Sequence, residues 1–186
     1  MPVWLSDDEF RTLSAACARM IPADETAGAV EAGAPEYIDA MLGAFLVDPP
    51  RIWAGGPSSG RFGGIAGFSR FHQLTALDEL AWRMRIEGSL GVAEREFNGP
   101  VIGWQQIYRD GLARLGSDFS EMSGDEQDAR LRAAEEFTAL LYEHCCEGMY
   151  GAPEYGGNRE TVAWRAIDFL GDVQSRGFSD AEVSEP

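Results

Sequence analysis

A segment rich in glycine and tyrosine, residues 148–158, interrupts the helical pattern of this chain and constrains its fold more than any other stretch. Its eleven residues hold four glycines, a proline and two tyrosines, and Trp164 follows six positions later. This composition neither continues a helix nor alternates like a strand, so it predicts a built loop. Fixing these backbones costs roughly 10–20 kcal/mol, while burying two tyrosines and a methionine returns about 5–9 kcal/mol. We therefore expect the loop either to lie across the protein's own helices or to be ordered by a docked partner, and the imbalance favours the partner.

Length and charge limit the classes of partner. A chain of 186 residues fits a single domain with its own core, and we expect a helical domain over residues 1–171 followed by an acidic tail over 172–186. Fifteen arginines, no lysine and 31 acidic residues give a net charge of −16, which repels nucleic-acid phosphates and anionic lipids. We expect no nucleic-acid partner, but a protein that is basic or carries an apolar patch rimmed with arginine.

Cysteine use and the first residues indicate a location. The three cysteines, Cys17, Cys145 and Cys146, are an odd number, which argues against a secreted disulfide framework. Residues 1–8 contain no apolar signal region and no twin arginine, and no run of about 18 apolar residues follows. We expect no membrane insertion and a cytoplasmic location, with export in the company of a partner left open.

Helix signals recur along the chain and predict an all-α fold. Ser6 with Glu9, Thr75 with Asp78, and Ser123 with Glu126 have the spacing of N-terminal capping pairs. Asn158 is suited to cap a last helix. Apolar residues spaced by three and four predict about six helices, over residues 6–20, 35–46, 75–87, 101–115, 123–149 and 158–170. Two long ordered loops hold much of the remaining glycine, proline and aromatic content, and no strand is predicted.

The second loop, residues 48–67, contains six glycines and three prolines but also large apolar side chains. Because a flexible linker would lack these side chains, we predict an inserted ordered arm. Arg51, Trp53 and Phe62 are of the residue types enriched at interface hot spots. A loop folded back on its own helices remains the alternative. The glycines do not form a phosphate-binding motif.

The candidate catalytic and metal residues are few. His144, Cys145 and Cys146 are zinc-ligand types, but consecutive helical positions point about 100° apart and cannot converge on one ion. A cysteine nucleophile paired with His144 or His72 describes a small stand-alone enzyme and remains open. The main prediction is that this chain has no catalytic residue, no metal site and no cofactor of its own.

Two segments resemble the gluconate 2-dehydrogenase subunit 3 family, the small subunits of flavin-dependent sugar and polyol dehydrogenases. One is residues 21–29, followed by Ala32-Gly33 and Tyr37-Ile38-Asp39, and the other is residues 148–158 with Trp164. The resemblance covers roughly residues 5–47 and 105–171. Residues 48–100 fall outside it.

The resemblance implies a non-catalytic, mainly helical subunit that binds a large oxidoreductase of the glucose-methanol-choline (GMC) type. That partner carries FAD and the active site, and the small subunit helps it to fold, mature or stay stable. Many members of the family begin with a twin-arginine signal that exports the complex. A generic helical interaction scaffold is a further alternative. The expected interface residues are Tyr150, Pro153, Tyr155, Gly156, Gly157, Asn158 and Trp164, extended by Arg51, Trp53 and Phe62.

Overall fold

The computed structural model describes residues 2–52 and 73–169. Trp53, Phe62, His72 and most of the predicted arm lie outside these residues. Within them the fold is all-α, as predicted, and no strand is present. The α-helices are α1 (Asp7–Met20), α2 (Ala34–Leu42), α3 (Ala76–Ile86), α4 (Trp104–Leu115), α5 (Gly124–Ala133), α6 (Glu135–Tyr150) and α7 (Val162–Ala166). No helix in these two ranges has both the length and the apolarity needed to cross a bilayer.

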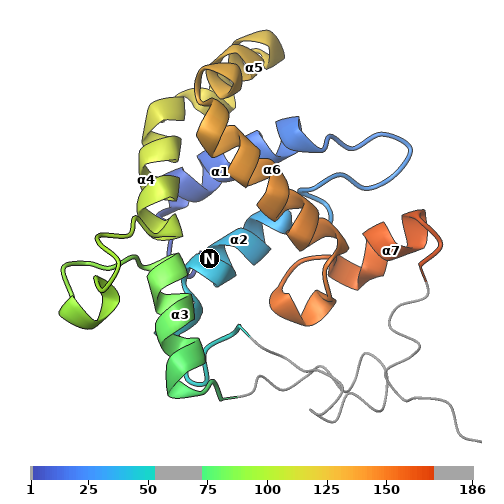
Figure 1. Ribbon diagram of the computed structural model, residues 1–186. Coiled ribbons are helices and arrows are strands. Elements are labelled where there is room, and N and C mark those ends of the chain that lie inside the picture. The colour runs from blue at the N-terminus through green and yellow to red at the C-terminus, as the bar shows by residue number, and fades with distance from the viewer. Residues whose placement is uncertain (1, 53–72, 170–186) are drawn as a thin grey trace, which may run out of the picture.

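The helices pack around a crossing of α2 and α6 at the centre of the molecule, with α1 against both (Figure 1). α3 and α4 lie on one side of this crossing, α7 lies on the other, and α5 extends from the start of α6. The core at the crossing is formed by apolar side chains whose spacing of three and four predicted it. Its fully buried members include Leu13, Cys17, Ile38, Leu42, Tyr108, Leu141 and Cys145.

The three predicted capping pairs form at the helix starts. The hydroxyls of Ser6 and Ser123 each accept a hydrogen bond from the backbone N–H three residues on. The carboxylate of the glutamate at that position accepts in turn from the backbone N–H of the serine. Thr75 accepts from the Asp78 N–H in the same way. These local bonds satisfy N–H groups that have no partner within the helix.

The prediction of a single helix over residues 123–149 is wrong, because the helix is interrupted at Ala134 (φ −112°, ψ 45°) and forms α5 and α6. At the break the carbonyl of Leu131 accepts from the Ala134 N–H at 3.0 Å and from the Thr138 hydroxyl at 2.8 Å. The threonine hydroxyl therefore links the end of α5 to the first turn of α6 across the bend.

The predicted last helix is also shorter than expected. Asn158 has φ 42°, Glu160 and Thr161 likewise have positive φ values, and α7 begins only at Val162. The Asn158 Oδ1 accepts from the N–H of Ala163 in the first turn of α7, so this side chain does bond to the start of the last helix, although the residue directly before that helix is Thr161. The chain therefore turns before it can become helical.

Asp39 lies in the first of the two segments that resemble the family (the signature segments). It ties the N-terminal residues to α2. Its buried carboxylate accepts the backbone N–H groups of Val3, Trp4 and Leu5, with the last two at 3.0 and 2.8 Å. Three amide donors compensate a buried carboxylate for its lost hydration.

Candidate protein-docking site

The two signature segments meet in space. The N–H of Arg159, directly after the second segment, donates to the carbonyl of Ala32 in the first segment at 2.8 Å. A Cβ atom on Gly148 would lie 2.8 Å from the Tyr37 ring, and one on Gly33 would lie 3.3 Å from the oxygen of Gly156. These close backbone approaches explain why the segments carry glycine where they touch.

Buried polar side chains fix the loop after α6 from within. Asn158 is fully buried, donates through Nδ2 to the Gly151 carbonyl at 3.0 Å and accepts from the Ala163 N–H at 3.2 Å. The Trp164 Nε1–H donates to the Tyr150 carbonyl at 2.7 Å. The expectation that this loop needs a partner to become ordered is therefore wrong, because its own hydrogen bonds and buried indole hold it.

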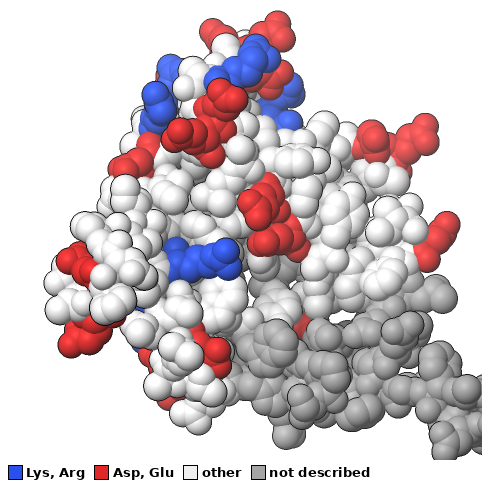
Figure 2. Space-filling view, viewed as in Figure 1, with Lys and Arg blue, Asp and Glu red and all other residues white. Residues whose placement is uncertain are grey.

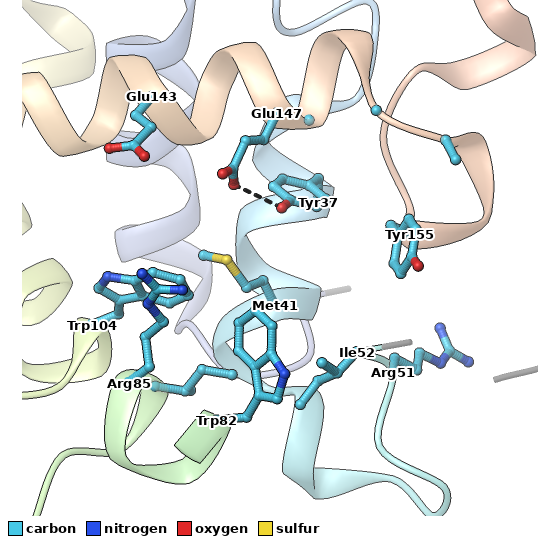
Figure 3. Close-up of a pocket in the computed structure, with 14 residues that line it drawn as sticks. Tyr37, Met41, Arg51, Ile52, Trp82, Arg85, Trp104, Glu143, Glu147 and Tyr155 are labelled. Atoms are coloured by element: carbon cyan, nitrogen blue, oxygen red, sulfur yellow. Dashed lines mark hydrogen bonds between the residues drawn. The ribbon is translucent and has the colours of Figure 1, made fainter. Parts of the chain in front are cut away.

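The loop forms one wall of a cleft of about 460 Å³, and α2, α3, α4 and α6 supply the other walls (Figure 3). Aromatic and charged side chains from all these elements face the same space. They are Tyr37, Arg51, Trp82, Arg85, Trp104, Glu143, Glu147 and Tyr155.

Two tryptophans and an arginine form the wall of the cleft between α3 and α4. The Trp82 and Trp104 rings lie 6.4 Å apart at 59°. The guanidinium of Arg85 lies 5.1 Å from the centroid of Trp104 and 5.7 Å from that of Trp82. Cation–π contacts of this kind hold the arginine in place while its N–H groups stay accessible.

The wall formed by α2 and α6 is acidic. The Tyr37 hydroxyl donates to Glu147 at 2.9 Å (Figure 3). Burial, together with this carboxylate, raises the pKa of Tyr37 well above its ordinary value. Tyr37 is therefore a fixed donor at neutral pH, and Glu143 projects from the next turn of α6.

His144 lies beneath the cleft, against Trp104, and is fully buried. Its ring packs edge to face with Trp104 at 4.7 Å, and its Nδ1 shares a hydrogen bond of 2.9 Å with the Tyr108 hydroxyl. Burial, with a smaller effect of the Arg85 charge, lowers the pKa of His144 to about 4. The imidazole is therefore neutral at pH 7 and pairs with a tyrosine, not with a cysteine.

The cysteines give the stand-alone enzyme no support among the described residues. Cys145 and Cys17 are both free and buried, and their thiols share a hydrogen bond. Burial is the main cause that raises the pKa of the Cys17 thiol. Such a thiol stays protonated and is a poor nucleophile. Within the described part of the chain, no three His, Cys, Asp or Glu side chains are grouped to hold a metal ion.

The predicted interface residues fall into two groups. Five of them are at least partly exposed to solvent: Arg51, Tyr150, Pro153, Tyr155 and Gly156. The buried ones, which hold the loop, are Gly157, Asn158 and Trp164. Most residues of the cleft were not predicted, because they lie on separate helices that converge only in the tertiary structure. The available signal in the sequence was a pair of tryptophans, Trp82 in α3 and Trp104 at the start of α4.

The loop between α3 and α4, residues 87–103, adjoins the cleft, since Ile86 and Trp104 at its two ends line it. This α3–α4 loop exposes large apolar side chains: Leu90 is 71% exposed, Phe97 92% and Ile102 71%. Because large exposed apolar side chains can mark a contact surface, the loop is a candidate for one.

Comparison with known proteins identifies a family. A family model described as gluconate 2-dehydrogenase subunit 3 matches residues 7–171, a range that includes residues 48–100. No curated protein and no solved structure matches the chain.

Proposed function

Since the chain belongs to the gluconate 2-dehydrogenase subunit 3 family, we propose that it is a non-catalytic accessory subunit that binds and stabilises an FAD-dependent oxidoreductase of the GMC type. The observation that carries this proposal is the preformed cleft, built where the two signature segments meet. In this proposal the flavin and the reacting atoms belong to the partner. The part of this chain is to bind the folded partner.

The residue types of the cleft support a protein as its occupant. Tryptophan, tyrosine and arginine are the types that dominate binding energy at protein interfaces. A stable interface buries about 800 Å² on each partner, so the cleft alone is too small. The apolar side chains of the α3–α4 loop, next to the cleft, extend the surface that a partner would cover.

Order within the cleft also supports docking. The loop after α6 is held by Asn158 and Trp164 before any partner arrives. A preformed surface loses little conformational entropy on binding, so more of the contact energy appears as affinity. Binding to the native partner then stabilises it by mass action, about 2.7 kcal/mol when this subunit is present at 100 times the dissociation constant.

Co-expression tests the proposal. This chain, carrying an affinity tag, is produced with a GMC-type flavoprotein from the same genome, beginning with a neighbouring gene. We expect the two to purify together, and we expect the flavoprotein to show higher FAD occupancy at 450 nm and a higher melting temperature than it does alone. Failure of such flavoproteins to bind contradicts the proposal.

A pair of tyrosine variants locates the contact. Tyr155→Ala alters the cleft wall, whereas Tyr142→Ala removes an exposed tyrosine of α6 that lines a different groove. We expect only Tyr155→Ala to weaken co-purification while the subunit itself stays folded. Equal binding by both variants would move the interface away from the cleft.

A further inference from the structure

We infer that Arg85 receives a carboxylate of the partner protein and thereby sets the register of docking. This inference rests on the proposed function and deepens it, because it specifies the chemistry of one contact in the cleft. The occupant is a segment of the partner that carries an aspartate, a glutamate or the C-terminal carboxylate.

Half of the twelve described arginines form ion pairs with carboxylates, and Arg85 is not among them. Ion pairs with carboxylates engage Arg11, Arg19, Arg83, Arg95, Arg130 and Arg159. Arg85 forms no ion pair with a carboxylate of the described residues, although the chain carries 31 acidic residues against 15 basic ones. Its contacts are the faces of two indoles on the cleft wall.

This geometry prepares the guanidinium for a carboxylate. Contact with Trp82 and Trp104 restricts the long side chain, and no side chain or backbone carbonyl of the described residues accepts from its N–H groups. A planar guanidinium presents parallel donors that match the two oxygens of a carboxylate. Because Arg85 is already held, less rotamer entropy is lost when the pair forms.

The charges around Arg85 favour one defined anion. Basic side chains lie beside acidic ones at the centre of the face where α3, α4 and α6 meet (Figure 2). Glu143 and Glu147 line the facing wall, where Glu147 is engaged with Tyr37, and Arg51 lies at the other end of the cleft. A polyanion is repelled by the net charge of −16. A single carboxylate is favoured where it meets Arg85 and disfavoured where it meets the two glutamates, which makes the contact selective.

The first test compares arginine variants in the complex with the flavoprotein. We expect Arg85→Gln to weaken binding about 10–100-fold, as loss of a charge-assisted interface pair does. Arg85→Lys keeps the charge but not the planar fork, so a smaller loss is expected. Arg114→Gln is the matched control, an exposed arginine of α4 outside the cleft, and should change affinity by less than about twofold. Thermal melting confirms that each variant is folded.

Charge reversal tests the identity of the anion. Arg85→Glu is combined in turn with Asp→Arg and Glu→Arg changes on the partner's surface, and we expect one partner variant to restore binding. If no reversal restores it, the assignment of a carboxylate is wrong. Unchanged binding by Arg85→Gln overturns the inference and leaves the proposed function standing, whereas failure of the wild-type chain to bind overturns both.

Discussion

Two irregular loops border the cleft: the loop after α6, residues 151–161, and the α3–α4 loop, residues 87–103. They differ in how far their side chains are buried. The loop after α6 buries Asn158 and packs over the indole of Trp164, which is 8% exposed. The α3–α4 loop turns Phe97 outward to 92% exposure. One loop therefore uses its characteristic side chains to stay folded, and the other displays them.

The order of the α3–α4 loop comes from polar groups at its base. Arg95 donates to Glu87 at 2.9 Å, and the Ser89 N–H donates to the Val101 carbonyl at 2.9 Å. The Ser89 hydroxyl also bonds to Glu96. The comparison teaches that order and exposure are separate properties: a loop with unusual composition can be sealed, while a less conspicuous one carries the uncovered apolar surface.

The largest effect is expected at Asn158. Asn158→Ala removes bonds to the Gly151 carbonyl and from the Ala163 N–H inside the protein, so we expect the free energy of unfolding to fall by about 3 kcal/mol. Urea titration followed by circular dichroism measures it. Asn98→Ala, at an exposed site of the α3–α4 loop, is the matched control. Equal effects at the two asparagines would remove the distinction between the loops.

Acid should weaken the region beneath the cleft by a similar amount. The pKa of His144 is about 4 when folded and about 6.5 in an unfolded chain, so between these values the unfolded state binds more protons. Stability is therefore complete above pH 6.5 and falls by about 3 kcal/mol as the pH drops toward 4.

Unfolding midpoints measured from pH 7 to 4 test this dependence. In His144→Gln the slope between pH 6.5 and 4.5 should flatten, although the variant is less stable throughout. His72→Gln changes the other histidine of the chain and separates its contribution. An unchanged slope in His144→Gln would show that the imidazole is not the titrating group.

A smaller loss is expected at Trp164. Trp164→Phe keeps an aromatic ring but removes the Nε1–H that bonds the Tyr150 carbonyl, so a loss of about 1–2 kcal/mol should follow. Trp82→Phe, at a half-buried cleft position, serves for comparison. Differential scanning calorimetry measures both. If Trp82→Phe were the more damaging change, the cleft wall and not the loop would depend on its indole.

The smallest effect on stability is expected at Phe97. Because its ring is almost fully exposed, Phe97→Ser should change the free energy of unfolding by less than about 0.5 kcal/mol. Under the proposed function the same variant should bind the flavoprotein more weakly in the co-purification assay. A loss of stability greater than about 1 kcal/mol would show that the α3–α4 loop buries this side chain in solution.

The fold was predictable wherever the signals are local. Ser6 and Glu9, three residues apart, form the capping box that their spacing predicts. The kink at Ala134 was not predictable, because at the kink the Leu131 carbonyl accepts from the Thr138 hydroxyl, seven positions away, as well as from the Ala134 N–H. Asn158, which was expected to cap the last helix, does accept from the Ala163 N–H in the first turn of α7. Its second bond, from Nδ2 to the Gly151 carbonyl, depends on the path of the loop and was not predictable.

The sequence by itself determined an all-α chain, the starts of its main helices and the family signature, because these follow from residue types and from contacts three or four positions apart. Only the tertiary structure decided that the loop after α6 is sealed and that a cleft opens beside it. Those features come from contacts between distant segments, such as Tyr37 with Glu147, which are 110 positions apart. Which side chains remain uncovered is settled by that packing, since burial depends on all neighbouring elements together.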